Sequence, residues 1–241
     1  MTTKGLVIIQ QNACGRDVCN GTRSLQDHKR LIERLKLENP DVLFLSEFCY
    51  ANMFAITKEA LNDYEFVKPL ALSTRDEHNE NLSASCILAI KHSAVLTYTQ
   101  TELANMLALR YICANLRFTQ GATVNFLLTY MPQTYGTSPD RIKWKAKMFC
   151  SASQYVERNC ALPLFVGGDM NSDIDGRTTS CISDFEKLYS SLTDTDREKK
   201  PTWNGKRLDY ALVSYPLRGA AETEQFTTNS DHAALKTILY I

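Results

Sequence analysis

Carboxylate, amide and imidazole side chains stand at the points of this sequence where apolar runs stop. The run DVLFLS ends just before a glutamate, the run PLFVGG ends just before an aspartate, and an aspartate and a histidine directly precede the last apolar run. Strand ends that meet at one rim of an α/β protein commonly supply its active-site groups. We therefore expect one cleft to collect Asn12, Glu47, Asp169, Asn171, Asp231 and His232.

These residue types suit the hydrolysis of a phosphate ester with the help of a hard divalent cation. Such a cation prefers carboxylate oxygens and keeps several water ligands, so Glu47 and Asp231 are the expected ligands of Mg²⁺, or of Mn²⁺. Asp169 could orient or deprotonate the attacking water, and Asn171 could hold that water or a phosphate oxygen. His232 could stabilise the charge that grows on the phosphate.

Asp209 lies within Arg207-Leu208-Asp209-Tyr210 and could accept a hydrogen bond from the second ring nitrogen of His232, which would fix the tautomer of that ring. Each residue also has an ordinary structural explanation. Glu47 could be a solvated loop carboxylate, the GDMN segment could be a simple turn, and Asp209 could pair with Arg207. The catalytic interpretation depends on the joint occurrence of these residues at strand ends.

The apolar patterns that must position these residues alternate between strand and helix periods. The strands do not alternate strictly with helices, which favours an α/β protein built as a four-layer sandwich, with two packed mixed β-sheets flanked by helices. Strands are predicted over 6–10, 41–46, 84–90, 111–118, 124–130, 160–166, 208–214 and 233–240, and helices over 24–37, 140–158 and 182–188.

Composition limits the class of protein. A chain of 241 residues that is 44% hydrophobic can bury one full core, so we expect one domain over residues 1–241. The 27 basic residues are balanced by 27 acidic ones, so the chain lacks the overall basic field of many nucleic-acid binders. Without a long apolar run or a signal-peptide core, the sequence predicts an intracellular protein with no membrane contact.

Eight cysteines are scattered singly along the chain. A chain of this size folds without disulfide staples, so we expect free thiols. Cys14, Cys19 and His28 match no common zinc spacing, and a fourth ligand is missing.

In their order along the chain, the candidate residues resemble the signature of the endonuclease/exonuclease/phosphatase superfamily. That signature has an Asn after the first strand, a Glu ending the second, a G-D-x-N, an R-[IL]-D-Y-x-x-x-S-like strand and a terminal S-D-H. The matching segments are Gln11-Asn12, Leu45-Ser46-Glu47, Gly168-Asp169-Met170-Asn171, Arg207 through Ser214, and Ser230-Asp231-His232. The resemblance spans essentially the whole chain and implies a metal-dependent phosphodiesterase in which Asn12, Asn171 and His232 contact the phosphate.

The middle of the chain separates branches of that superfamily. Inositol-phosphate phosphatases, sphingomyelinases, deadenylases and pancreatic-type deoxyribonucleases usually carry a His-containing segment after the middle strand, whereas this chain has Tyr130-Met131-Pro132. That segment resembles the Tyr-x-Pro of apurinic endonucleases, exonuclease III and LINE-type retrotransposon endonucleases. The resemblance implies a phosphate contact for Tyr130.

Three positions depart from the pattern of that branch. Cys14 stands where abasic-site enzymes usually have an Asp, and Gln133 stands where an Asn usually follows Tyr-x-Pro. Both changes weaken an assignment to abasic-site repair. Ser46 replaces the usual Gln before the signature Glu.

Basic and aromatic residues near the motifs are the candidates for contact with nucleic acid. Trp203 is the expected stacking surface, because it lies just before RLDY in a loop that should border the site, and Arg207 and Arg177 are expected phosphate contacts. Most surface Lys and Arg only keep a protein soluble. Further candidates are Arg16, Arg23, Tyr135, Lys143, Lys145 and Lys206.

We therefore expect a monomeric, Mg²⁺- or Mn²⁺-dependent endonuclease in which water attacks the phosphorus of DNA in line and leaves a 5′-phosphate and a 3′-hydroxyl. Two other classes remain open. One is a phosphatase or phosphodiesterase acting on a small phosphorylated metabolite or lipid headgroup, which the neutral net charge permits. The other is a non-catalytic descendant that only binds a partner, although no central residue has been lost. The sequence leaves open DNA or RNA, and a free enzyme or one domain of a larger retroelement protein.

Overall fold

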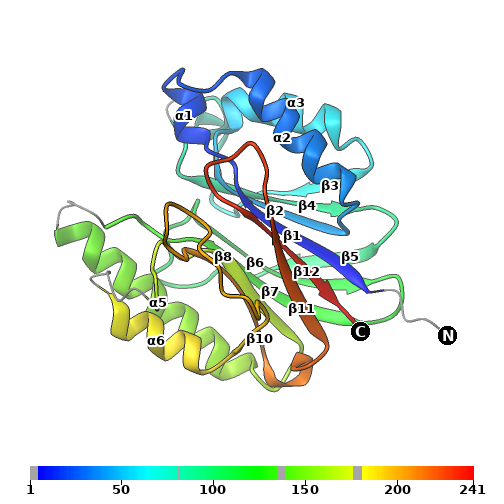
Figure 1. Cartoon of the computed structure of the whole chain (residues 1–241), viewed down its shortest axis with the longest axis vertical. Helices are drawn as coiled ribbons and strands as arrows, with labels where there is room; N and C mark the ends of the chain where they lie inside the picture. The colour runs from blue at the N-terminus through cyan, green and yellow to red at the C-terminus, as the bar shows by residue number, and fades with distance from the viewer. Residues whose placement is uncertain (1–4, 81, 135–138, 176–180) are drawn as a thin grey trace.

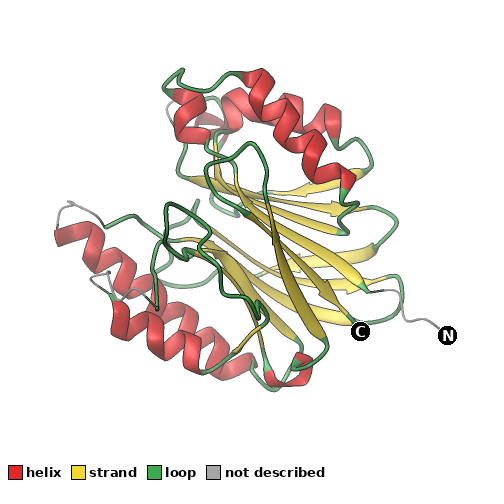
Figure 2. Ribbon diagram, in the orientation of Figure 1, coloured by secondary structure: helices red, strands yellow, loops and turns green. Residues whose placement is uncertain are grey.

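Two six-stranded β-sheets face each other in the computed structural model of this chain, and helices cover their outer faces (Figures 1 and 2). The structure describes residues 5–80, 82–134, 139–175 and 181–241. The four-layer sandwich that the sequence predicts is therefore confirmed.

Each sheet has one parallel pair of strands near its centre, β1 with β2 and β7 with β8, and its other pairs are antiparallel. In spatial order the first sheet contains β11 (Ala221–Phe226), β12 (Ala234–Leu239), β1 (Leu6–Asn12), β2 (Val42–Phe48), β4 (Ser85–Lys91) and β3 (Tyr64–Val67). The second contains β5 (Val95–Gln100), β6 (Tyr111–Phe118), β7 (Thr123–Tyr130), β8 (Leu164–Asp169), β10 (Asp209–Val213) and β9 (Thr193–Asp194).

The longer helices lie outside the sheets. The α2 (Leu25–Leu37) and α3 (Tyr50–Ala60) helices pack on the first sheet, and α5 (Pro139–Asn159) and α6 (Ile182–Ser190) pack on the second (Figure 1). The α2 helix begins where it does because Ser24 and Asp27 form a capping box, in which each side chain bonds the other's backbone N–H. Shorter helical segments are α1 (Gly15–Cys19), α4 (Thr74–Glu77) and the 3₁₀ turn Tyr215–Leu217.

The central strands are apolar on both sides because both of their faces are covered. Ile8 points into the core between the sheets, whereas its neighbour Ile9 packs beneath α2 and α3. Along β2, Phe44 faces the inner core and Leu43 and Leu45 face the helices. This double burial explains the continuous apolar run DVLFLS.

The predicted elements differ from the observed ones in two ways. The strand predicted over 160–166 begins later, at Leu164, and continues through two glycines to Asp169. Gly168 permits this because its φ is +114° and a Cβ there would lie 2.1 Å from the carbonyl oxygen of Thr129. The sequence prediction also missed α3, β3, β5 and β11; β5 and β11 carry polar, partly exposed side chains that lack a clear apolar face.

All eight cysteines are free thiols, as expected. Within the described ranges, no helix is both long and apolar enough to cross a membrane.

Candidate active site

Six strands bring their ends to one rim of the sandwich. Asn12 ends β1, Glu47 lies next to the end of β2, and Asp169 ends β8. Because β10 and β12 run antiparallel to β8 and β1, their first residues reach the same rim. The register places Asp169 opposite both Tyr130 of β7 and Asp209 of β10.

The buried carboxylate of Asp169 is held from two sides. Asn12 Nδ2 donates to Asp169 Oδ2 at 3.1 Å, and the backbone N–H of Asn171 donates to Oδ1 at 2.8 Å. The Asn171 side chain is itself fixed, because its Nδ2 donates to the carbonyl of Met131 at 2.8 Å. Burial, followed by the negative charge of Asp209, raises the pKa of Asp169 well above its usual value. Asp169 is thus a carboxylate suited to accepting a proton near neutral pH.

His232 and Asp209 form a buried hydrogen-bonded pair, with 2.8 Å between Nδ1 and Oδ2. Burial alone would lower the pKa of His232, but the charges of Asp209, Asp169 and Asp231 raise it to about 10. The imidazole is therefore positively charged at neutral pH, with its second nitrogen available as a hydrogen-bond donor. The ring of Trp203 lies beside it, 6.0 Å away between centroids.

Asp169, Asp209 and His232 form one group that could hold a divalent metal ion, since their ligand atoms lie within 4.8 Å of one another. However, His232 Nδ1 is hydrogen-bonded to Asp209, and a protonated ring nitrogen cannot ligate a metal. These three side chains therefore suit the movement of protons, and an ion fits better beside the neighbouring carboxylates.

Glu47 is turned into the site by an irregularity in β2. The register between β2 and β4 shifts between Ser46 and Phe48, and the φ of Glu47 is +52°. Gly15 packs against the carbonyl oxygen of Glu47 so closely that a Cβ would lie 2.2 Å from it. Burial raises the pKa of Glu47, and the charge of Asp231 adds to the rise despite a hydrogen bond from Asn12.

A cavity of about 310 Å³ contains Glu47, Asp231 and Asp17 together with His232 and Trp203. Besides burial, the charges of Asp231 and Asp17 raise the pKa of Glu47. The three carboxylates therefore form an oxygen-rich group whose negative charge a hard divalent cation would neutralise. The residues present thus fit the metal that the motifs imply.

Cys14 stands where abasic-site enzymes usually have an Asp. Its Sγ donates to Asp231 Oδ1 at 2.7 Å, and Trp203 Nε1 donates to Asp231 Oδ2 at 2.9 Å. Burial, with help from the charge of Asp231, raises the pKa of Cys14 to about 12. Cys14 is thus a neutral thiol that orients Asp231.

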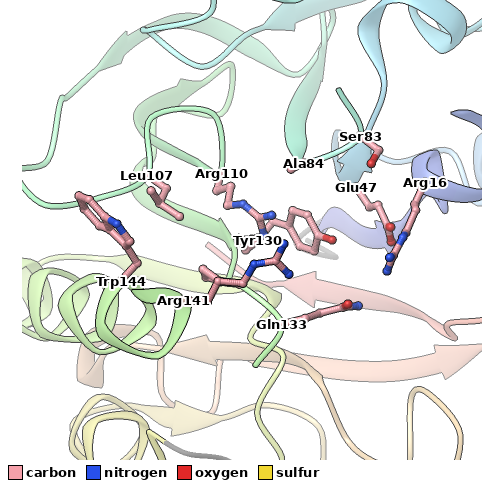
Figure 3. A pocket seen from close by; sticks show the side chains of 11 residues that line it. Arg16, Glu47, Ser83, Ala84, Leu107, Arg110, Tyr130, Gln133, Arg141 and Trp144 are labelled. Atoms are coloured by element: carbon pink, nitrogen blue, oxygen red, sulfur yellow. Dashed lines mark hydrogen bonds between the residues drawn. The ribbon is translucent and has the colours of Figure 1, made fainter. Parts of the chain in front are cut away.

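A second cavity, of about 290 Å³, adjoins the first, and both are lined by Arg16, Glu47 and Gln133 (Figure 3). Tyr130 lines this second cavity, and the guanidinium carbon of Arg110 lies 4.5 Å from the centre of its ring. Together the two cavities make a depression that extends to both sides of Glu47.

Arg207 does not lie on this surface, so its expected contact with nucleic acid is wrong. Its side chain is only 2% exposed and forms two contacts of 2.7 and 2.8 Å with the carboxylate of Asp194, with Asp196 nearby at 3.7 Å. The guanidinium therefore ties β9 to the segment that leads into β10. Asp209 pairs with His232 instead of Arg207.

Other basic candidates have different outcomes. Lys145 is fully buried, and its ammonium donates to the backbone carbonyl of Asn171, so it supports the GDMN turn and cannot reach a ligand. Arg177 and Tyr135 lie outside the described residues. Arg16 lines both cavities, and Trp203 borders the site as expected.

Sequence reasoning missed Arg110, Arg141 and Trp144, which line the second cavity. Arg110 belongs to no motif; it reaches Tyr130 only because β6 pairs with β7. Arg141 and Trp144 stand three residues apart at the start of α5, which places them on one face of that helix. That spacing is the one signal the sequence offered.

Comparisons with known proteins agree with this geometry. A family model described as "Endonuclease/Exonuclease/phosphatase family" matches residues 10–232. A search of curated proteins finds no match. Among solved structures, D. rerio TDP2 complexed with a single strand DNA product has a TM-score of 0.70 at 16% identity, covering 97% of this chain and 98% of that one.

Two other similar structures carry different names. The human Nocturnin catalytic domain with bound sulfate has a TM-score of 0.70 at 19% identity, covering 98% of this chain and 93% of that one. The endonuclease domain of TRAS1, a telomere-specific non-LTR retrotransposon, has a TM-score of 0.68 at 12% identity and covers 98% of both chains. At such low identities the likeness shows the fold, and no branch is singled out. The matched family segment, however, runs from β1 to His232 and includes every side chain gathered at the rim, so this chain belongs to the endonuclease/exonuclease/phosphatase family of metal-dependent phosphoester hydrolases.

Proposed function

We propose that the protein is a divalent-metal-dependent endonuclease that hydrolyses the backbone of DNA and leaves a 5′-phosphate and a 3′-hydroxyl. One observation carries this proposal: the two cavities meet at Glu47 and extend to both sides of it. A polynucleotide must continue on both sides of the bond that is cut, whereas a small phosphomonoester needs space on one side only. The continuous depression therefore favours a chain-like substrate.

The side chains at the rim divide the work of the reaction. Asp169 takes the proton of the attacking water as the new P–O bond forms, and the P–O3′ bond breaks while O3′ gains a proton from solvent. Asn12 and Asn171 hold Asp169 in place and face the phosphate. Protonated His232, oriented by Asp209, donates to the phosphate oxygen on which negative charge grows.

Glu47 and Asp231 are the proposed metal ligands, with Asp231 oriented by Cys14 and Trp203. When bound, Mg²⁺ or Mn²⁺ supplies positive charge beside the phosphate oxygens and neutralises the acidic cavity. Tyr130, at the end of β7, is the proposed contact on the far side of the phosphate. The described similar structures include one that holds a single strand DNA product and one named as an endonuclease domain, which supports a polynucleotide substrate.

Incubation of supercoiled plasmid with the protein in magnesium, in manganese and in EDTA tests the proposal. A closed circle has no ends, so nicking can only be endonucleolytic. We expect nicking with either metal, none with EDTA, and a loss of about a thousandfold or more for Asp169→Asn. A matched control is Asp63→Asn, which removes a carboxylate at the opposite rim of the first sheet and should leave nicking unchanged.

The substitution of Asp169 leaves one of its two hydrogen bonds unmade, so the variant must first be shown to fold by circular dichroism. His232→Asn serves as a second inactive variant. Hydrolysis of a phosphomonoester without any nicking would contradict the proposal and favour the small-substrate phosphatase. Salt separates these classes further, because cleavage that depends on several phosphate contacts weakens steeply as salt rises.

A further inference from the structure

The cavity of about 290 Å³ that Tyr130 lines carries positive charges that no salt bridge among the described residues neutralises. Arg16, Arg110 and Arg141 line it, and Glu47 is the one carboxylate among the described residues that line it. The arginines that form salt bridges among the described residues are Arg30, Arg34, Arg197 and Arg207, so none of the three has a carboxylate partner there. In a protein of zero net charge, this local excess indicates an anionic ligand.

The three guanidinium groups come from separate elements and are directed into one space. Arg16 lies on α1, Arg110 directly precedes β6, and Arg141 lies in the first turn of α5. In Figure 3 the side chains of Arg110 and Arg141 point toward the ring of Tyr130, and Arg16 lies at the Glu47 end. Arg110 is fixed by stacking on Tyr130 and by donating from Nη1 to its carbonyl at 3.5 Å. Planar guanidinium forks of this kind match the geometry of a phosphate.

An aromatic surface lies at the other end of the same cavity. Trp144 is 40% exposed and lines the cavity at the end opposite Glu47 (Figure 3). Lys147 Nζ lies 4.8 Å from the centre of one of its rings. An exposed indole beside arginines is the combination that stacks a nucleobase while its backbone phosphate is bound.

The proposed function places the phosphate that is cut in the neighbouring cavity, and Arg110 and Arg141 line only this one. His232 and Asp231 line the other cavity, and Tyr130 stands between that chemistry and Arg110. We propose that Arg110 and Arg141, with Arg16, bind the phosphate next to the scissile one, and that Trp144 stacks the base of that flanking nucleotide. This inference rests on the proposed function and narrows the substrate, because a base must be unpaired to lie against Trp144. The preferred DNA is therefore single-stranded or frayed beside the cut.

Binding of a short fluorescent single-stranded oligodeoxynucleotide, followed by anisotropy in EDTA so that no cleavage occurs, tests the inference. Arg141→Ala should weaken binding about tenfold and reduce the slope of log K against log salt by about one. Arg158→Ala is the matched control, since Arg158 is an exposed arginine at the other end of the same helix, and it should change binding by less than about twofold. Trp144→Ala should weaken binding about tenfold at every salt concentration, with recovery in Trp144→Phe.

A scan with single neutral methylphosphonate linkages then locates the phosphate. The wild type should lose affinity when the linkage next to the scissile one is neutral, and Arg141→Ala should be insensitive to that replacement. Equal binding by Arg141→Ala and Arg158→Ala, with plasmid nicking intact, would overturn the subsite and leave the endonuclease proposal standing. A wild-type protein that neither binds nor nicks DNA would overturn both.

Discussion

The 2.8 Å hydrogen bond between His232 Nδ1 and Asp209 Oδ2 joins the two sheets of the sandwich at the active-site rim. Asp209 begins β10 of the second sheet, and His232 lies just before β12 of the first. The imidazole that we propose acts in catalysis is therefore held near Asp169, which pairs with Asp209 across β8 and β10. Any relative movement of the sheets would disturb this pair.

Asp209→Asn should lower the pKa of His232 and reduce turnover. Burial lowers the pKa of His232 and Asp209 is the largest influence that raises it, so the pKa should fall when the charge of Asp209 is removed. Turnover should fall about 10²–10⁴-fold, because an amide in place of the carboxylate neither stabilises the charged ring nor fixes its tautomer. NMR titration of the imidazole protons measures the pKa, with exposed His92 as the internal control. An unchanged His232 pKa would contradict the assignment.

Cys14→Asp should lower the Mg²⁺ concentration needed for half-maximal activity. Cys14 contributes a neutral thiol to the acidic cavity, next to Asp231, whereas a carboxylate would add a negative charge and two oxygen ligands. We expect roughly a tenfold shift at constant ionic strength. Cys14→Ser is the control, because a hydroxyl keeps the hydrogen bond to Asp231 without adding charge. If both variants need the same Mg²⁺ concentration as the wild type, the ion does not bind beside Asp231.

Gly168→Ala should destabilise the protein and displace Asp169. A Cβ at this position would lie 2.1 Å from the Thr129 carbonyl oxygen, at a φ of +114°. We expect a loss of about 2–4 kcal/mol in the free energy of unfolding. Gly121→Ala separates the cost of the positive φ from the cost of the steric contact, because Gly121 has a φ of +96° with open space around it. This variant should lose only about 1–2 kcal/mol in the free energy of unfolding. Urea denaturation of both variants gives the comparison, and equal losses would show that the contact with β7 does not matter.

Arg207→Ala should destabilise the fold and leave the salt dependence of DNA binding unchanged. Removing the guanidinium leaves the carboxylates of Asp194 and Asp196 without their salt-bridge partner, which costs about 3–5 kcal/mol. A phosphate contact would behave in the opposite way, with a reduced salt slope and little loss of stability. Thermal denaturation and anisotropy titrations of the same samples distinguish the two roles.

The sequence predicted the residues that are placed by strand ends, and it failed for those placed by tertiary contacts. Asn12 and Glu47 lie at strand ends of the first sheet and Asp169 ends a strand of the second, and each follows an apolar run that indicates a strand end. Arg207 was misjudged because its partner Asp194 is 13 residues away, across a loop that no periodicity describes. Arg110 was missed for the same reason, since it meets Tyr130 through strand pairing and not through any motif.

The bulge that presents Glu47 could not be predicted either. The sequence around Glu47 has the pattern of an ordinary buried strand. Only the shifted pairing of β2 with β4 shows that the strand is irregular there. The close approach of Gly15 to the Glu47 carbonyl is likewise a tertiary contact. Local patterns therefore indicated which residues gather, whereas their orientation required the packed structure.

His28 should make stability fall on the acid side of neutrality. Its side chain is buried, Nε2 is hydrogen-bonded to Thr57 Oγ1 at 2.8 Å, and Nδ1 has no partner among the described residues. Burial, with a smaller effect of Arg23, lowers the pKa of His28 from 6.5 to about 3. The unfolded chain therefore binds a proton at His28 below about pH 6.5, while the folded chain remains neutral there. This contribution to stability is complete above about pH 6.5 and is lost as the pH falls toward 3.

Urea denaturation at about pH 7.5 and about pH 5 measures the effect, which should amount to about 2 kcal/mol in the wild type. His28→Asn keeps a donor for Thr57 but cannot titrate, so its stability should change less between the two pH values. The quantity to compare is the difference in the free energy of unfolding between the two proteins at each pH. The contribution of the carboxylates that titrate in both proteins cancels in this difference. If the variant shows the same pH dependence as the wild type, His28 is protonated in the folded state and the ring must have access to water at the α2–α3 interface.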